Sequence, residues 1–196
     1  MVKYSDMEMS YIETAHNINS YPIKKPIRAI LGLGANLGDT EKTLVSAVEC
    51  IKRLPRARYI RSSSMYVTEP VETPDVQPDY INMIVEIEAD CSPFMILGMC
   101  LGIESAHMRQ RLSEKAARTL DIDLIVCGVC GEEPAGHIIL STDELTLPHP
   151  RMMERGFVLV PLAELYPERK IFDIDFSDAL KRCTNQRVRL FDKRLT

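Results

Sequence analysis

The sequence predicts an α+β fold, in which a mainly antiparallel sheet carries helices packed on it. Three observations support this class: an ordinary globular composition, two segments of helical periodicity, and buried-strand patterns before, between and after them. Hydrophobic residues make up 45% of the 196 residues and charged residues 27%, a mix typical of a globular domain with a sizeable core. The elements follow one another in the order βαββαβ, which favours a ferredoxin-like sandwich.

The first elements follow a polar start. Residues 1–25 are polar and lack periodicity, so we interpret them as an N-terminal extension and place the domain at residues 26–196. Residues 27–34, Ile-Arg-Ala-Ile-Leu-Gly-Leu-Gly, form an apolar run typical of a buried strand. A helix is then expected to start at Asp39 or Thr40 and to end at Pro55, because apolar residues recur at helical spacing between them.

The middle of the chain predicts two strands and a second helix. Residues 59–67 and 80–89 alternate well enough for strands, and the proline-rich residues 69–78 between them indicate a loop. Ser92-Pro93 is a strong helix start, with Ser at the N-cap and Pro at the first helical position. We expect the buried stripe of this helix to contain the apolar residues Phe94, Leu97, Leu101 and Met108.

The last part of the chain contains one more clear strand and weaker signals. The charged residues 109–118 predict a mobile loop, and residues 119–127 a strand. Residues 147–150, Leu-Pro-His-Pro, break the chain before a short helix and an apolar run at 157–162. Residues 176–182 are expected to form a helix capped by Ser177.

Composition also limits the partners and the compartment. The formal net charge of -4 and pI near 5.6 give no general attraction for nucleic acid or an anionic membrane. No apolar run reaches membrane-spanning length, and the first residues do not form a signal peptide. Six cysteines, several in apolar patterns, fit reduced core thiols, so we expect a cytoplasmic protein. Cys127 and Cys130 lack further zinc-ligand partners and indicate a strand-end turn.

The segment Arg118-Thr119-Leu120-Asp121-Ile122-Asp123 carries the most informative pattern. Alternate residues of a strand share a face, so Asp121 and Asp123 project together, roughly 6–7 Å apart, away from the aliphatic side chains. Like charges this close repel each other unless a cation lies between them, and Mg²⁺ takes carboxylate and phosphate oxygens together. One alternative is a strand with a solvated face that carries two aspartates by chance.

Other polar residues are placed to form a site. Tyr80 and Asn82 can face one pocket, with a ring to stack on a heterocycle and an amide to read its edge, although a core Tyr beside a solvated Asn remains the alternative. Arg109 and Arg111 lead into a charged loop with the composition of a lid over a polyphosphate. Downstream, His149 and Arg155 can contact phosphate.

Taken in order, these segments resemble the 6-hydroxymethyl-7,8-dihydropterin pyrophosphokinase family of folate synthesis. The resemblance covers about residues 30–167 and is most specific in Arg-Thr-Leu-Asp-Ile-Asp at 118–123, Leu-Pro-His at 147–149 and Arg-Gly-Phe at 155–157. It implies transfer of pyrophosphate from ATP to the pterin hydroxymethyl group, with release of AMP. It also implies two Mg²⁺ ions as cofactors.

The resemblance further implies a role for each candidate residue. The catalytic group would be Arg109, Arg118, Asp121 and Asp123, with the two aspartates as metal ligands. The pterin would be bound by Thr68, backbone around Val71, Tyr80, Asn82 and Phe157. The ATP side would be lined by Glu104, Arg111, Thr146, His149 and Arg155. The partners would be the small-molecule pterin and ATP, and we expect a monomer, with an oligomer left open.

Two other functions stay open at this point. The chain could be a catalytically silent pterin- or nucleotide-binding protein of the same fold whose loop at 109–118 no longer closes. It could also be a structural domain whose function resides in residues 1–25. Residues 109–118 contain no aromatic residue, and the chain has no Trp.

Overall fold

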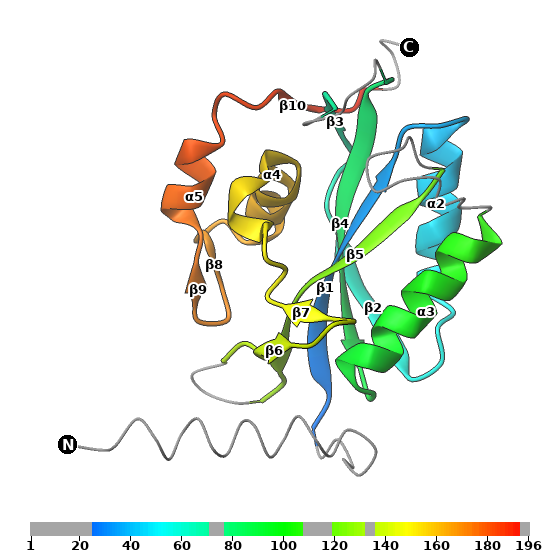
Figure 1. Ribbon diagram of the computed structural model, residues 1–196, viewed down its shortest axis with the longest axis vertical. Coiled ribbons are helices and arrows are strands. Elements are labelled where there is room, and N and C mark those ends of the chain that lie inside the picture. Colours follow the sequence, from blue (N-terminus) through cyan, green and yellow to red (C-terminus); the bar gives the residue numbers. More distant parts are fainter. Residues whose placement is uncertain (1–24, 71–76, 108–118, 132–135, 193–196) are drawn as a thin grey trace.

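The computed structural model describes residues 25–70, 77–107, 119–131 and 136–192. Its main sheet has the strand order β10-β3-β4-β1-β5, with β2 also paired to β4, and every pairing is antiparallel. Helices α2 and α3 cover one face and α4 and α5 the other (Figure 1). The α+β class and the expected antiparallel sheet with packed helices are confirmed.

Six strands form the main sheet, and five helical segments and two small hairpins complete the described part of the chain. The main sheet contains β1 Ile27–Ala35, β2 Ala57–Ser62, β3 Tyr66–Thr68, β4 Tyr80–Ala89, β5 Asp121–Val129 and β10 Val188–Leu190. The helices are α2 Thr40–Ile51, α3 Pro93–Ala106, the 3-10 helix η1 Met152–Glu154, α4 Gly156–Leu165 and α5 Ser177–Arg182. Two small hairpins pair β6 Leu140–Ser141 with β7 Thr146–Leu147, and β8 Lys170–Ile171 with β9 Ile174–Asp175.

Both predicted helix starts are observed. The Asp39 side chain caps α2 by accepting a hydrogen bond from the Lys42 amide at 3.1 Å, which decides between the two candidate positions. The Ser92 hydroxyl caps α3 by accepting from the Met95 amide at 3.3 Å. These bonds satisfy backbone donors that a helix leaves open in its first turn.

The expected buried face of α3 is only partly right. Phe94 and Leu97 pack against the core, but Leu101 is exposed and Met108 lies outside the described residues. The buried residues of the helix are Ile96, Cys100, Ile103 and Glu104. Apolar residues occur all around this helix, so the sequence gives little periodicity from which to choose a face. Packing against β5 then decides which side is buried.

Two other predicted boundaries are corrected. The single strand expected over residues 59–67 is two strands, β2 and β3, which pair with different parts of β4. Ser177 is the first residue of α5, not its cap. Its amide donates to the Asp175 carboxylate at 2.8 Å, and no side-chain cap bond is formed from Phe176.

The sheet separates two apolar clusters. One lies under α2 and α3 and includes Leu31, Leu33 and Val85, whereas the other lies under α4 and α5 and includes Ile30, Ile84 and Ile125. None of the helices in the described part of the chain is long and apolar enough to cross a membrane.

The turn of the β8–β9 hairpin gives a prediction about stability. A Cβ atom at Gly128 would lie within 2.7 Å of three ring carbons of Phe172. We expect Gly128→Ala to lower the free energy of unfolding by about 1–3 kcal/mol, because the ring must move away from β5. The control Gly98→Ala, in α3 with no atom within 4 Å of the new methyl, should not destabilise the protein. Urea unfolding of both variants measures this, and equal stabilities would refute the packing argument.

Candidate active site

The register of the three central strands brings the candidate residues together. Gly34 of β1 is paired with Asn82 of β4 on one side and with Asp121 of β5 on the other. Two residues earlier, Gly32 is paired with Asp123 in the same way. Directly opposed residues of antiparallel strands share a face, so the amide and both carboxylates lie on one face of the sheet.

The same face of the sheet is covered by α4 at the neighbouring positions of β1, β4 and β5. Ile30, Ile84 and Ile125 belong to the apolar cluster that packs against α4. The polar residues therefore lie at the end of a buried surface, beside the start of α4. Asp123 remains 37% exposed at its side chain, as a metal or substrate ligand must be before it binds.

Asn82 is held in one orientation by its neighbours. It is 7% exposed, and its amide nitrogen donates to the Thr68 hydroxyl at 2.7 Å. A Cβ atom on Gly34 would lie 2.7 Å from the Asn82 side-chain oxygen, so only glycine leaves room for it. The predicted pair Thr68 and Asn82 thus lies together, with Asn82 buried, and the alternative of a solvated Asn is excluded.

Tyr80 lies next to this pair on β4. Its hydroxyl donates to the Gln77 side-chain oxygen at 3.1 Å, and the Asn36 amide nitrogen also donates to that oxygen, at 3.3 Å. Tyr80 is opposite Thr68 in the strand register. Sequence reasoning did not assign Gln77 or Asn36 to the site, because their contacts with each other and with Tyr80 become visible only in the structure.

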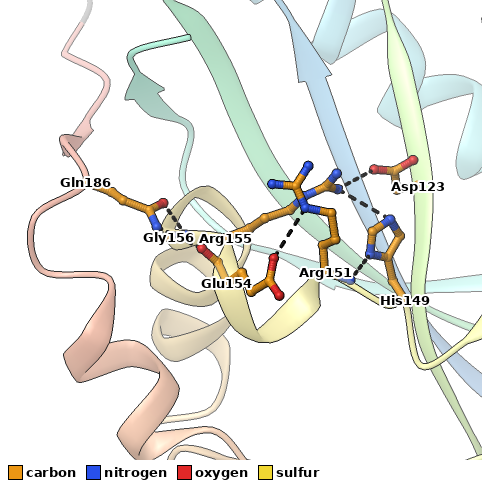
Figure 2. A network of polar contacts seen from close by, with 7 residues as sticks. All are labelled: Asp123, His149, Arg151, Glu154, Arg155, Gly156 and Gln186. Carbon is orange, nitrogen blue, oxygen red and sulfur yellow. Dashed lines mark hydrogen bonds and ion pairs between the residues drawn. The ribbon is translucent and has the colours of Figure 1, made fainter. Parts of the chain in front are cut away.

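A second group of polar residues surrounds Asp123. The Arg155 guanidinium lies 3.3 Å from the Asp123 carboxylate and 3.4 Å from His149 Nε2 (Figure 2). The same guanidinium lies 5.4 Å from the centre of the Phe157 ring. Backbone bonds place His149 here, because its amide donates to the Ile125 carbonyl of β5 at 2.7 Å.

The surroundings of His149 favour the uncharged form of its imidazole. Burial lowers the pKa of His149 and the Arg155 guanidinium lowers it further, against the opposing effect of Asp123. The Arg151 amide donates to His149 Nδ1 at 3.1 Å, so this nitrogen acts as an acceptor. The cluster of Asp123, Arg155 and His149 therefore contains one negative and one positive charge around a neutral ring.

The position of Glu104 could not be predicted from the sequence, because its side chain is buried against the backbone of β5. It is 2% exposed and accepts a hydrogen bond from the Ile122 amide at 2.7 Å. Ile122 lies between Asp121 and Asp123, so α3 holds the strand at the point from which both aspartates project. Its predicted contact with ATP stays a prediction.

The remaining candidates divide into two groups. Thr146 lies in β7, opposite Ser141. Val71, Arg109, Arg111 and Arg118 lie outside the described residues, as do residues 1–24, so the predictions made for them are not tested.

The donor set fits Mg²⁺ better than a metal held by protein ligands alone. Within the described ranges, no three His, Cys, Asp or Glu side chains are placed to hold a metal ion together. Asp121 and Asp123 offer two carboxylates on one face. Mg²⁺ commonly binds one or two carboxylates together with substrate phosphates and water. Such a pair can take part in phosphoryl-type transfer when a phosphorylated substrate completes the site.

Comparisons with known proteins point to one family. Residues 30–167 match the sequence model of 7,8-dihydro-6-hydroxymethylpterin-pyrophosphokinase (HPPK). The chain is 37% identical over 155 residues to the 2-amino-4-hydroxy-6-hydroxymethyldihydropteridine pyrophosphokinase of Methylorubrum extorquens, covering 79% of this chain and 92% of the relative. It is 35% identical over 139 residues to the Haemophilus influenzae protein of that name, with 71% and 81% covered.

A solved structure agrees at the level of the fold. Wild-type HPPK-DHPS of Plasmodium falciparum, crystallised with pterin and p-hydroxybenzoate, superposes with a TM-score of 0.57 at 15% sequence identity. The match covers 81% of this chain but only 43% of that longer one. The sequence match to the family model spans most of the chain and includes the strand with both aspartates, so this chain belongs to the 7,8-dihydro-6-hydroxymethylpterin-pyrophosphokinase family.

Proposed function

We propose that this chain transfers the pyrophosphoryl group of ATP to the hydroxymethyl oxygen of 6-hydroxymethyl-7,8-dihydropterin and releases AMP. As a family member it is an ATP-dependent diphosphotransferase of folate biosynthesis. One observation carries the detailed proposal: the strand register places Asn82, Asp121 and Asp123 on one face, around the glycines of β1. Asn82, which would recognise the edge of the pterin, then lies beside Asp121 and Asp123, which would bind the metal ions and phosphates.

The pterin side is assigned to the Asn82 end of this face. An amide held by Thr68 presents its carbonyl oxygen in a fixed direction, and a fixed donor–acceptor pattern is what discriminates between heterocycles. Tyr80 and Phe157 would stack on the two faces of the ring, with the backbone around Val71 adding hydrogen bonds. The partly covered Tyr80 and Phe157 side chains are compatible with this role.

The ATP side is assigned to the other end, around Asp123. Arg155 and the neutral His149 offer a cation and a hydrogen-bonding ring next to the carboxylate. Thr146, Glu104 and Arg111 would complete this side, and Arg109 and Arg118 would neutralise phosphate charge. Two Mg²⁺ ions would be held by Asp121 and Asp123, and when bound they would offset the charge of the phosphates and polarise their oxygens.

The chemistry then depends mostly on position. The hydroxymethyl oxygen forms a bond to the β-phosphorus of ATP, the bond from that phosphorus to the oxygen bridging it to the α-phosphate breaks, and one proton is released. Phosphoryl-type transfer needs alignment and charge neutralisation more than covalent catalysis. The residues of this chain supply the alignment through a rigid strand pair, with Arg155 as a fixed positive charge.

The direct test is AMP formation from ATP and 6-hydroxymethyl-7,8-dihydropterin, with and without Mg²⁺. AMP that appears only with both pterin and Mg²⁺ supports the proposal. Pterin binding without AMP would instead support a catalytically silent binding protein.

Replacement of either aspartate tests the metal assignment. We expect Asp121→Asn and Asp123→Asn each to lower the rate of AMP formation by about 100-fold or more, because each removes a charge placed against the phosphates and metal. Thermal unfolding should change little, since both side chains lie partly exposed. Asp143→Asn, at an exposed position, is the matched control. A large drop in thermal stability with unchanged turnover of the folded protein would make the pair structural.

Gly34 tests the pterin assignment. We expect Gly34→Ala to weaken pterin binding about tenfold, because the new methyl displaces the Asn82 side chain from Thr68 at the cost of about one hydrogen bond. The control is Gly32→Ala on the same face of β1, where the methyl meets apolar side-chain atoms of Ile125 at 3.1 Å and of Ile84 at 3.9 Å. Calorimetric titration with the pterin measures both. Equal affinities in the two variants would argue against a pterin contact at Asn82.

The protonation of His149 predicts a pH dependence. The pKa of His149 is lowered in the folded protein, so the unfolded chain binds this proton more readily. The contribution to stability is therefore complete above about pH 6.5 and is lost as the pH falls below it. His149→Asn keeps an acceptor for the Arg151 amide without titrating and should flatten this part of the curve. Urea unfolding in EDTA between pH 7.5 and 5 measures it, and parallel curves would contradict the assignment.

A further inference from the structure

The N-terminus of α4 is held by a residue that follows α5. Gln186 lies between α5 and β10, and its side-chain oxygen accepts a hydrogen bond from the Gly156 amide at 2.7 Å. Its side-chain nitrogen donates to the Glu154 carbonyl at 2.8 Å. Figure 2 shows this side chain against the backbone at the start of α4. The Gln186 side chain is therefore hydrogen-bonded to the backbone on both sides of Arg155.

These bonds supply a cap that the local sequence lacks. Gly156 is the first residue of α4, and its amide is one of the donors that a helix leaves without an intrahelical partner. Arg155 stands at the N-cap position and makes no side-chain cap bond. The contact is close, because a Cβ atom on Gly156 would lie 2.9 Å from the Gln186 side-chain oxygen. Gly156 therefore provides room for the glutamine.

The segment held in this way carries two residues of the proposed site. Arg155 has extended backbone between η1 and α4, and its guanidinium reaches Asp123 and His149. Phe157, the next residue after Gly156, has its ring 5.4 Å from the same guanidinium. Movement of the Glu154–Gly156 backbone would shift both side chains together.

The segment that carries Gln186 also holds β3, which lies on the other side of the proposed pterin pocket and contains Thr68. Immediately after Gln186, β10 pairs with β3, and Val188 is opposite Thr68. The Arg187 guanidinium lies 2.8 Å from the Glu69 carboxylate. One short stretch, residues 186–190, thus bonds to the backbone of both walls of the proposed pterin pocket. It lies beyond residues 30–167, which match the family model.

We propose that Gln186 is a positioning residue, which fixes Arg155 and Phe157 for substrate by holding the backbone on both sides of Arg155. This inference rests on the proposed function. A residue with a purely structural role would change only stability, whereas a positioning residue changes the substrate affinity and turnover of the protein that is folded. Misplacement of positioned groups by about 1 Å is enough to reduce turnover by about 100-fold.

The experiment compares Gln186→Met with Gln186→Glu. Methionine keeps the length and packing of the side chain and removes both hydrogen bonds, whereas glutamate keeps an acceptor for the Gly156 amide. We expect Gln186→Met to lower kcat/KM for the pterin at least tenfold, and Gln186→Glu to recover part of that loss. Lys181→Ala, which removes an exposed ion pair within α5, is the control and should stay within twofold of the wild type. Kinetics are measured at a temperature at which unfolding curves show every variant folded.

A readout that does not need activity accompanies the kinetics. Hydrogen exchange of the Gly156 amide should be faster in Gln186→Met than in the wild type, while exchange in β4 and β5 is unchanged. Wild-type kcat/KM in a folded Gln186→Met protein would overturn the inference and leave the proposed function intact. A wild-type protein that neither binds the pterin nor makes AMP would overturn both.

Discussion

The whole arrangement depends on the register of β1 between β4 and β5. A slip of one residue would turn every side chain of β1 to the other face, and Gly34 would no longer be opposite Asn82 and Asp121. The register is fixed by burial, because Leu31 and Leu33 pack under α2 and α3 while Ile30 packs under α4. The pairing shifts between Ile30 and Leu31, so that Ile125 is an extra residue of β5, and Ile125 and Val126 both belong to the cluster under α4. The core therefore determines where the site residues meet.

One sheet face serves as core and as site, and small residues make this possible. Gly34 carries no side chain, so the Asn82 side chain of β4 can extend over β1, whereas the space at Gly32 is taken by Ile125 and Ile84. Where the face becomes apolar, at Ile84 and Ile125, α4 covers it. The site begins where that cover ends. Arg155, at the start of α4, therefore reaches the carboxylate of Asp123 without crossing the hydrophobic cluster.

The sequence predicts the central fold well because its strands and helices are long enough to show a period. The two-residue strands of the small hairpins are too short for a pattern, and α3 is apolar on too many sides to reveal its buried face. Within the site, spacing correctly placed Asp121 and Asp123 on a common face. The Glu104 bond to the Ile122 amide had no sequence signal, because an acidic residue near a helix end usually indicates solvent. Gln186 had none either, since its contacts join residues 30 or more positions apart.

Because β10 follows all the other strands of the main sheet in the sequence, it pairs with β3 last as the chain is synthesised. A chain is synthesised from its N-terminus, so β1, β4, β5 and α4 all exist before residues 186–190 do. The central sheet and both apolar clusters can form from the earlier residues, whereas β10 must add to the edge of β3 afterwards. The two sides of the proposed pocket that β10 and Gln186 bridge are joined only after residues 186–190 have been added. A shortened chain would thus keep most of its hydrophobic core and lose the tie between the halves of its pocket.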